Sequence, residues 1–340
     1  MGRNIAIIGA GSWGTALSVL LANNGHQVKM WTIFKDEADM INQQREHVSK
    51  LPGVAVPEGV TCTLDVEEAL KDSEAVVMVV PSHTIRSSAK GISKFIDKGK
   101  LVISCSKGIE EGTGLRLSQV ISQEIPQAQV AVLCGPSHAE EVGRGVPTTV
   151  VSACESKETA EFIQDIFMSP RFRVYTNPDV VGVELGAALK NVIALCAGIS
   201  DGLGFGDNTK AALMTRGMAE ISRLGVAMGA KPQTFAGLTG IGDLIVTCTS
   251  MHSRNRRAGI LIGQGKSMQE AIDEVKMVVE GVTTAKAAYE LSTKMNISMP
   301  ITSEAYEVLF NGKSAKQAVM DLMMRNKKHE IEETAVLGSW

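Results

Sequence analysis

Three glycines near the N-terminus have the spacing of a phosphate-binding turn. In "NIAIIGAGSWG", Gly9, Gly11 and Gly14 follow a short apolar run, Ile5 to Ile8, and come directly before a helical stretch. In that setting the first glycine permits a tight turn, the second lets the backbone approach a pyrophosphate, and the third lets the helix pack closely on a sheet. The helix N-terminus also attracts an anion. The pattern predicts a dinucleotide site, and the alternative is a glycine-rich turn that binds no ligand.

A lysine in the second half of the chain has a setting suited to proton transfer. The helix expected over residues 180–200 holds Lys190 on a face of small or apolar side chains. These neighbours are Val183, Gly186, Ala194 and Ala197. A groove lined by small residues leaves room for a ligand, and burial lowers a lysine pKa toward the range useful for acid–base catalysis. The alternative is a lysine that snorkels at a domain interface, and the sequence leaves both open.

Positive charge is concentrated in residues 252–259, "HSRNRRAG", although the chain has a net charge of -3. A solvated helix face, a nucleic-acid patch and a pocket for a small phosphate are the three explanations. Arginines at the start of the short helix expected here oppose its dipole unless an anion docks there. Because helical spacing turns Arg254 and Arg256 about 200° apart, we predict Arg254 and Asn255 at a phosphate pocket. Arg256 and Arg257 are expected at the surface.

Composition narrows the classes of protein that fit this sequence. With 340 residues, 44% hydrophobic and 21% charged, the chain is typical of a soluble globular protein of about two domains. Its 34 Lys+Arg against 37 Asp+Glu give no basic excess for nucleic acid. No uninterrupted apolar run approaches the roughly 18 residues of a membrane span. The six cysteines form no CxxC pair, so we expect reduced thiols in the cytoplasm and no metal site.

Apolar runs alternate with helical segments in the first half of the chain. The expected strands cover residues 5–8, 26–32, 74–80, 100–106, 129–135, 148–154 and 172–176. Strands separated by helices predict an α/β fold in which a doubly wound parallel sheet of the Rossmann type has helices on both faces. Ligands of such sheets bind outside the carboxyl ends of the strands. The polar loops at residues 81–83, 107 and 135–141 are therefore expected to converge on the glycine-rich turn.

The pattern becomes helical after residue 177. Helices are expected over residues 180–200, 207–229, 267–277 and 314–324. Asn177 and Asn208 are the expected caps of the first two. We therefore expect a dinucleotide-binding Rossmann domain over residues 1–177 and an all-helical domain, with the substrate and catalytic groups, over residues 178–340.

Six motifs along the chain resemble those of one enzyme family. They are "GAGSWGTAL", "SKGIE", "GPSHAEEV", "ELGAALKNVIALCAGISDGLGFGDNTKAAL", "GIGDLIVTCTS" with "SRNR", and "VVEGVTTA". Together they resemble the NAD(P)-dependent glycerol-3-phosphate dehydrogenases of the soluble bacterial type. The resemblance implies a Rossmann domain, a helical domain like that of 6-phosphogluconate dehydrogenase, and an active site in the cleft between them. It also implies interconversion of dihydroxyacetone phosphate and sn-glycerol 3-phosphate with NAD(H) or NADP(H), which feeds phospholipid synthesis.

The resemblance implies roles for particular residues. Lys190 would donate and accept the proton. The implied substrate site consists of Lys107, Gly135, Ser137, Lys190, Asp243, Ser253, Arg254 and Asn255. The implied cofactor contacts, beside Gly9, Gly11 and Gly14, are Ser12, Trp13, Lys107, Ala139, Arg254, Val278 and Glu280. No metal is needed for this reaction. A small phosphorylated substrate is the expected partner, and a homodimer is a candidate assembly.

The chain departs from this family at the adenine–ribose end of the cofactor site. Ile33 and Phe34 stand where many relatives carry basic residues, and Lys50 replaces the aromatic residue that precedes "LPG". Phe34 is placed to lie against adenine, and Lys50 is kept among the cofactor-binding candidates.

Cofactor preference depends on the residues after the second strand. An acid at the strand end binds the ribose hydroxyls of NAD, whereas an arginine nearby binds the 2′-phosphate of NADP. The strand end, "WTIF", offers neither. Lys35 is the candidate cation for a 2′-phosphate, and Asp36 and Glu37 are expected in the first turn of the next helix. We therefore expect dual use of NADH and NADPH, with a preference under about 100-fold, or ~3 kcal/mol.

Two alternatives remain beside this function. One is a related two-domain reductase of a hydroxy acid, of the beta-hydroxyacid or ketopantoate type, which acts on carboxylates. The other is a non-catalytic Rossmann protein that senses nucleotides.

Overall fold

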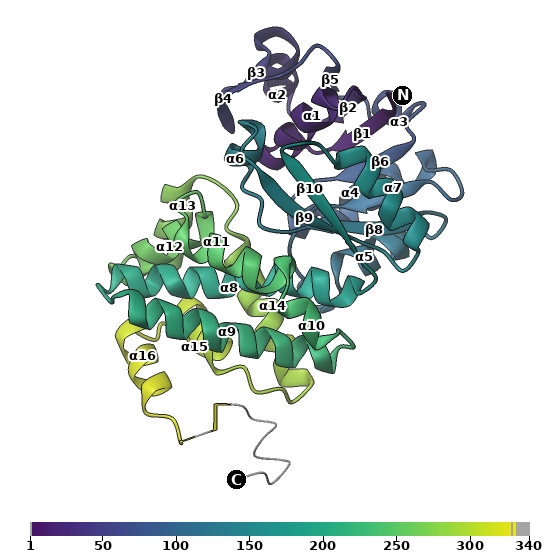
Figure 1. Ribbon diagram of the computed structural model, residues 1–340. Helices are drawn as coiled ribbons and strands as arrows, with labels where there is room; N and C mark the ends of the chain where they lie inside the picture. The colour runs from purple at the N-terminus through teal and green to yellow at the C-terminus, as the bar shows by residue number, and fades with distance from the viewer. Residues whose placement is uncertain (1, 328, 331–340) are drawn as a thin grey trace.

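The computed structural model describes residues 2–327, 329 and 330, and has a sheet-containing domain followed by a helical one (Figure 1). An eight-stranded sheet forms the N-terminal domain, in the order β10-β9-β8-β7-β6-β1-β2-β5. The strands are β1 (Asn4–Ile8), β2 (Gln27–Trp31), β5 (Val60–Thr63), β6 (Ala75–Met78), β7 (Leu101–Ser104), β8 (Gln129–Cys134), β9 (Thr148–Ala153) and β10 (Phe172–Asn177). Ile5 of β1 lies opposite Val28 on one side and Ala75 on the other. The central strands β1, β6 and β7 are buried on both faces because helices cover each face of the sheet.

One pair of neighbouring strands departs from the expected parallel sheet. β9 runs antiparallel to β8, with Val132 opposite Ala153. The chain between them contains only the short helix α6 (Ala139–Gly143), which packs against α1 (Ser12–Asn23). Because this segment does not cross back over the sheet, β9 starts at the edge where β8 ends. The sheet is therefore mixed, with every other pair of neighbours parallel.

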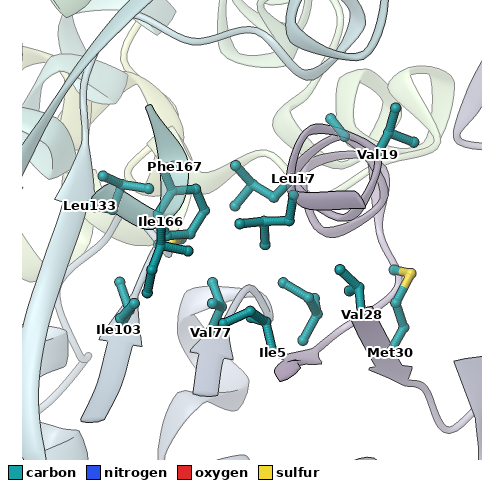
Figure 2. Packing of buried hydrophobic residues seen from close by; sticks show 14 of the residues in the cluster. Ile5, Leu17, Val19, Val28, Met30, Val77, Ile103, Leu133, Ile166 and Phe167 are labelled. Carbon is teal, nitrogen blue, oxygen red and sulfur yellow. The ribbon is translucent and has the colours of Figure 1, made fainter. Parts of the chain in front are cut away.

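Helices pack on both faces of the sheet. They are α1 and α7 (Lys157–Phe167) on one face, and α3 (Val66–Leu70), α4 (Ile85–Ile92) and α5 (Leu117–Glu124) on the other. Figure 2 shows the first of these cores, where Leu17 of α1 and Phe167 of α7 lie over Ile5 and Val77 of the sheet. The doubly wound architecture is thus confirmed, and the burial of these side chains holds the glycine-rich turn at the end of β1.

The segment between β2 and β5 begins with α2 (Lys35–Asp39), the helix whose first turn was expected to hold Asp36 and Glu37. The sequence pattern did not predict the elements that follow, which are the π-helical turn η1 (Met40–Gln44) and a hairpin of β3 (Glu46–His47) and β4 (Leu51–Ala55). Each is too short for its periodicity to be detected. The loop between β3 and β4 reaches the start of α1, where Ser12 Oγ donates a hydrogen bond to the carbonyl of Lys50 at 2.7 Å.

Helices joined by loops make up the described residues of the C-terminal domain, which is built around α8 (Val180–Gly202), the helix that runs across it in Figure 1. The other helices are α9 (Asp207–Ala227), α10 (Pro232–Phe235), η4 (Leu238–Gly242), α11 (Asp243–Thr249), α12 (Arg254–Gly263), α13 (Met268–Val275), α14 (Glu280–Lys294), α15 (Pro300–Phe310) and α16 (Ala315–Met323). Asp179 caps α8 by accepting from Gly182 N, so the expectation of Asn177 as the cap is wrong. Asn208 is likewise not a cap, because it lies inside α9, which begins after Gly206.

α8 is long and apolar enough, by length and composition alone, to cross a membrane. Its apolar 18-residue window is 83% buried inside the protein. The sequence expectation considered only uninterrupted apolar runs, and α8 is interrupted by Glu184, Lys190 and Asn191. All three are buried, and Lys190 and Asn191 bind Asp243 and Asn255 of the candidate site, whereas Glu184 pairs with Arg116 of the other domain.

α8 and α12 approach each other unusually closely because glycines face one another. A Cβ added to Gly198 would lie 2.1 Å from the carbonyl oxygen of Arg256, and one added to Gly259 would lie 2.1 Å from that of Leu195. No side chain fits at either position, so the backbones are in contact. This contact fixes the N-terminus of α12, with Arg254 and Asn255, beside the middle of α8.

Candidate active site between the two domains

Two lysines from different domains share one buried carboxylate. Lys190 Nζ, on α8, donates to Asp243 Oδ1 at 2.8 Å and to Thr247 Oγ1 at 2.6 Å. Lys107 Nζ, from the loop after β7, donates to Asp243 Oδ2 at 2.7 Å and to the carbonyl of Gly135 at 2.8 Å. Asp243 is only 1% exposed, whereas the Lys107 side chain is 18% exposed. The cluster therefore sits at the domain interface, with Lys107 as its more open side.

The charges in this cluster perturb each other's pKa values. Burial lowers the pKa of Lys190 to about 8, with the charge of Lys107 acting in the same direction and that of Asp243 opposing it. Burial also opposes the charge on Lys107, but the carboxylate of Asp243 outweighs it and holds the pKa of Lys107 above its usual value. Burial disfavours the ionised Asp243, yet the two ammonium groups keep its pKa below the usual range. Lys190 can therefore exchange a proton near neutral pH.

The face of α8 around Lys190 differs from the predicted ligand groove. A Cβ added to Gly186 would lie 2.5 Å from the carbonyl of Thr239, so this glycine allows η4 to pack on α8. Ala194 and Ala197 are buried in the core of the helical domain. The small residues therefore serve helix packing. α11 places Asp243 at the domain interface, and Lys190 lies at the interface because it binds Asp243.

The N-terminus of α12 presents an arginine that has no partner among the residues described by the structure. Arg254 makes no hydrogen bond or ion pair with any residue that the structure describes, and it is half-buried. Burial lowers the pKa of its guanidinium, with Glu280 and Glu140 opposing this effect. Ser253 caps the helix by accepting from Arg256 N at 3.2 Å. A desolvated guanidinium beside free helix N–H groups is suited to bind a phosphate.

Asn255 is tied to two neighbouring helices. Its Nδ2 donates to Asn191 Oδ1 at 2.9 Å, and its Oδ1 accepts from Gly281 N at 2.8 Å. The Asn255 side chain thus joins α8, α12 and α14 at the N-terminus of α12. This network holds the first turn of α12 in place beside Arg254.

The expected surface location of Arg256 is wrong. Its guanidinium pairs with Asp201 at 2.8 Å and donates to the carbonyl of Thr249 at 2.6 Å, and its side chain is 14% exposed. The close contact between α8 and α12 brings this side of α12 against the end of α8. Arg257 is also partly enclosed, and its Nε is buried with no hydrogen-bond partner in the described residues.

The three glycines at the end of β1 each have the predicted geometry. Gly9 has a φ of +114°, and a Cβ there would lie 2.7 Å from the carbonyl of Val79. A Cβ on Gly11 would meet nothing within 4 Å, whereas one on Gly14 would lie 2.0 Å from the carbonyl of Gly9. The N-terminus of α1 carries no side-chain cap, and the indole Nε1 of Trp13 is buried without a partner in the described residues. Open space, free N–H groups and an unpaired donor fit the pyrophosphate of a dinucleotide.

The adenosine end of the site contains a buried carboxylate. Glu37 lies in the first turn of α2, as expected, but it is only 6% exposed. It accepts from Thr32 Oγ1 at 2.6 Å and pairs with the ammonium of Lys50. Phe34 is 55% exposed, and Lys50 Nζ lies 5.6 Å from the centre of its ring. Lys35, the expected partner of a 2′-phosphate, instead pairs with Asp39 at 2.5 Å and is directed along α2.

The remaining candidates lie along the interface. Ser137 Oγ donates to the carbonyl of Gly135 at 3.0 Å, and Ala139 begins α6 after them. Glu280, the first residue of α14, accepts from Ser82 N at 3.0 Å and from the Ser82 hydroxyl. Val278 lies two residues before α14 and is half-buried. The loop after β6 thus meets α14, and the loops after β7 and β8 meet α11.

Metal ligands do not gather anywhere in residues 2–327, 329 and 330, where no group of three or more His, Cys, Asp or Glu side chains is placed to hold an ion. All six cysteines are free, and burial raises the pKa of several of their thiols, such as Cys105.

Comparison with known proteins decides the family. Residues 4–160 match the N-terminus, and residues 179–320 the C-terminus, of NAD-dependent glycerol-3-phosphate dehydrogenase. The chain belongs to this family. It is 58% identical to the glycerol-3-phosphate dehydrogenase [NAD(P)+] of Agathobacter rectalis, with 96% of this chain and 97% of that protein covered. It is 56% identical to that of Moorella thermoacetica over the full length of both chains.

A solved glycerol-3-phosphate dehydrogenase has the same fold. The crystal structure from Coxiella burnetii superposes with a TM-score of 0.92 and 36% identity, and covers 95% of this chain and 99% of that one. The predicted architecture, enzyme class and nucleotide cofactor are therefore confirmed at the level of the glycerol-3-phosphate dehydrogenase family. The hydroxy-acid reductase and the nucleotide sensor are the less favoured alternatives.

Three polar residues of the site were missed by the sequence interpretation. Thr247 contacts Lys190, Asn191 contacts Asn255, and Glu37 contacts Lys50. Thr247 follows Asp243 by one helical turn, so the spacing of the two residues could have identified it. The other two depend on contacts between different elements of the fold. Ser82, which contacts Glu280, lies in the polar loop at residues 81–83 that the sequence had placed at this edge of the sheet.

Proposed function

We propose that this protein interconverts dihydroxyacetone phosphate and sn-glycerol 3-phosphate with NAD(H) or NADP(H), in the cleft between a domain of residues 1–177 and one of residues 178–340. The observation that carries the proposal is the buried Lys190, whose pKa is about 8 and which is held on Asp243 opposite Lys107. Membership of the glycerol-3-phosphate dehydrogenase family supports it. The product would supply glycerophospholipid synthesis in the cytoplasm.

Lys190 is the proposed proton donor and acceptor. A bound nicotinamide cofactor would supply the hydride for reduction of the C2 carbonyl. The ammonium of Lys190 gives its proton to the C2 oxygen as negative charge develops there. Lys107 and Lys190 carry two positive charges against the single negative charge of Asp243, so the cluster has a net positive charge that stabilises an oxyanion. In the oxidative direction the neutral amine of Lys190 accepts the proton of the C2 hydroxyl.

Arg254 is the proposed phosphate ligand. Its guanidinium has no partner among the described residues and lies at the N-terminus of α12. Ser253 and Asn255 hold the first turn of the helix, and Gly135 and Ser137 line the opposite side of the interface. Binding the remote phosphate orients C2 toward Lys190.

The chain also has residues to hold the cofactor. Gly9, Gly11, Ser12, Trp13 and Gly14 are proposed at the pyrophosphate, and Phe34 and Lys50 at the adenosine. Lys107, Ala139, Arg254, Val278 and Glu280, at the domain interface, are proposed as the remaining cofactor contacts. A homodimer stays a prediction, which light scattering tests.

The Lys190→Met variant tests this proposal. The variant keeps an unbranched apolar side chain of similar length, so it should fold and bind NADH normally. Because general acid–base groups contribute roughly 10²–10⁴-fold, kcat for reduction of dihydroxyacetone phosphate should fall by that factor while KM changes little. The control is Lys313→Met, which removes a lysine paired with Glu304 and Asp321 elsewhere in the helical domain. A kcat near that of the wild type for Lys190→Met would remove Lys190 from the mechanism.

A further inference from the structure

A carboxylate occupies the end of β2 even though the sequence there, "WTIF", contains no acid. Glu37 comes from the following helix, but its side chain turns back to Thr32, whose Oγ1 donates to Glu37 Oε2 at 2.6 Å. Thr32 is the first residue after β2. In Rossmann folds this is the position from which a carboxylate accepts hydrogen bonds from the adenosine ribose. Folding therefore places a carboxylate at the end of β2, although the sequence at the strand end contains no acidic residue.

Lys50 places an ammonium group at the same point. It pairs with Glu37 Oε1, and its Nζ lies 5.6 Å from the centre of the exposed Phe34 ring. Its backbone carbonyl accepts from Ser12 Oγ, which ties it to the first turn of α1 beside Gly11. The Lys50 side chain is 38% exposed, so its charge is accessible from solvent. Lys50 thus faces the region between the glycine-rich turn and the expected adenine surface.

Three other basic side chains lie in residues 33–56. His47 is buried, with its Nε2 3.9 Å from Glu37 Oε1, and burial lowers its pKa below the usual value, which favours the neutral imidazole. Lys35 pairs with Asp39 on the same helix and is 72% exposed. The Arg45 guanidinium donates to the backbone carbonyls of Val56, Pro57 and Val60. Lys50 is therefore the cation of this segment that is available to a ligand.

We propose that Glu37 and Lys50 act as a pair that determines how the ribose 2′ position of the cofactor is recognised. The Glu37 carboxylate accepts from the 2′-hydroxyl of NADH, and the Lys50 ammonium pairs with the 2′-phosphate of NADPH. This inference rests on the proposed dinucleotide site and names the residues that set its specificity. Lys50, and not Lys35 as the sequence predicted, is the proposed partner of the 2′-phosphate.

The charges of the pair fit the expected use of both cofactors. A carboxylate alone repels a 2′-phosphate, and an ammonium alone attracts it, whereas the pair has no net charge. Because Glu37 is buried and Lys50 is partly exposed, the lysine can turn toward a phosphate while Thr32 continues to hold the carboxylate. Removing either charge should shift the preference, and in opposite directions.

The test measures binding of NADH and NADPH separately, by the fluorescence of the reduced nicotinamide, without a substrate. In Lys50→Met the Kd for NADPH should rise by roughly tenfold or more, as expected for a lost charge-assisted hydrogen bond, and that for NADH by less than about threefold. In Glu37→Gln the Kd for NADPH should fall and that for NADH should rise, so their ratio shifts at least about tenfold toward NADPH. Lys35→Met is the matched control and should change neither.

Several outcomes would overturn the inference. One is an equal loss of both cofactors in Lys50→Met, because it would give Lys50 a structural role only. Another is a selective loss of NADPH in Lys35→Met. If Glu37→Gln does not fold, the double variant with Lys50→Met removes both charges and must bind the two cofactors with a smaller difference than Lys50→Met alone. A larger difference would contradict the pair.

Failure of the proposed reaction has a different signature. Selective shifts in binding with no turnover of dihydroxyacetone phosphate would support the pair and refute the substrate. A wild-type protein that binds neither dinucleotide would refute both.

Discussion

Asp243 carries one negative charge between two ammonium groups, and this balance sets the pH at which Lys190 loses its proton. The positive charge of Lys107 lowers the pKa of Lys190, whereas the negative charge of Asp243 raises it. Lys107 also pairs with Asp243. In Lys107→Met, Asp243 is left to Lys190 alone, so the pKa of Lys190 should rise above its value of about 8. Reduction needs the ammonium form, which is present below this pKa and lost as the pH rises through it.

We therefore expect the alkaline limb of the profile of kcat against pH for reduction to shift to higher pH. The pH at which kcat for reduction falls should be higher in Lys107→Met than in the wild type, although kcat itself is lower. For oxidation, which needs the neutral amine, kcat should rise with pH, and this rise should occur at a higher pH in the variant. Profiles of kcat against pH in both directions measure this. A limb that stays in place or moves to lower pH would mean that Lys190 is not the titrating group.

Arg254 and Arg256 are two residues apart but should have different roles. Arg254→Ala removes from the proposed phosphate pocket a guanidinium that pairs with none of the described residues, so kcat/KM for dihydroxyacetone phosphate should fall by an amount equivalent to about 2–5 kcal/mol. Arg256→Ala breaks the bonds to Asp201 and Thr249, so the free energy of unfolding should fall by about 1–3 kcal/mol. Steady-state kinetics and urea unfolding of both variants separate the two roles. A loss of kcat/KM in Arg256→Ala together with a loss of stability in Arg254→Ala would place Arg256, and not Arg254, at the phosphate.

At the scale of elements, the start of α15 is held by a carboxylate from α9. Glu220 is 2% exposed and accepts from Ile301 N at 2.7 Å and from Thr302 N at 3.2 Å. Burial outweighs these hydrogen bonds and raises the pKa of Glu220 to about 7. Between its unfolded value near 4.5 and about 7, the folded protein keeps a proton that the unfolded chain has lost. The contribution of Glu220 to stability is therefore complete below pH 4.5 and is lost as the pH rises through 7.

Glu220→Gln should remove this pH dependence. From pH 5 to pH 7 the free energy of unfolding of the wild type should fall by about 2 kcal/mol relative to that of the variant. Urea unfolding at several pH values measures the difference. Glu270→Gln is the control, because hydrogen bonds from Ser267 lower the pKa of Glu270, whose contribution is constant above about pH 5. A difference between wild type and Glu220→Gln that is flat across this range would contradict the expectation.

At the scale of the whole molecule, buried polar contacts join the two domains. Beside Lys107–Asp243 and Ser82–Glu280, Arg116 Nη1 pairs with Glu184 Oε2 at 2.5 Å, and Ser118 N and Oγ also donate to Glu184. Arg116→Met leaves the buried carboxylate with the Ser118 donors only. The free energy of unfolding should fall by about 1–3 kcal/mol.

Chemical unfolding of Arg116→Met and of a control tests the interface. The control is Arg3→Met, which breaks an arginine pair with Glu74 whose partners are 37% and 44% exposed, and which should cost under about 1 kcal/mol. Because Lys107 and Asp243 come from different domains, kcat should also fall in Arg116→Met but not in Arg3→Met. Equal effects on stability and kcat in the two variants would show that the buried pair does not hold the active site together.

The sequence by itself determined what depends on neighbours along the chain. The spacing of Gly9, Gly11 and Gly14 after an apolar strand predicted their geometry, and the change of periodicity after residue 177 predicted a sheet followed by helices. It also singled out Lys190 and Arg254, although the groove expected around Lys190 is a helix-packing face. Glycine spacing and the periodicity of helices and strands depend on residues only a few positions apart, so the sequence alone shows them.

Only the tertiary structure decided which distant residues meet. It reversed β9 against β8, moved Arg256 from the surface to Asp201, and brought Glu37 and Lys50 together at the end of β2. It also placed Asp243 between lysines from the two domains. The sequence gives the type of an acidic residue but not whether its carboxylate lies on the surface or between two ammonium groups. Its burial, and hence its charge interactions, depend on how elements far apart in the chain pack together.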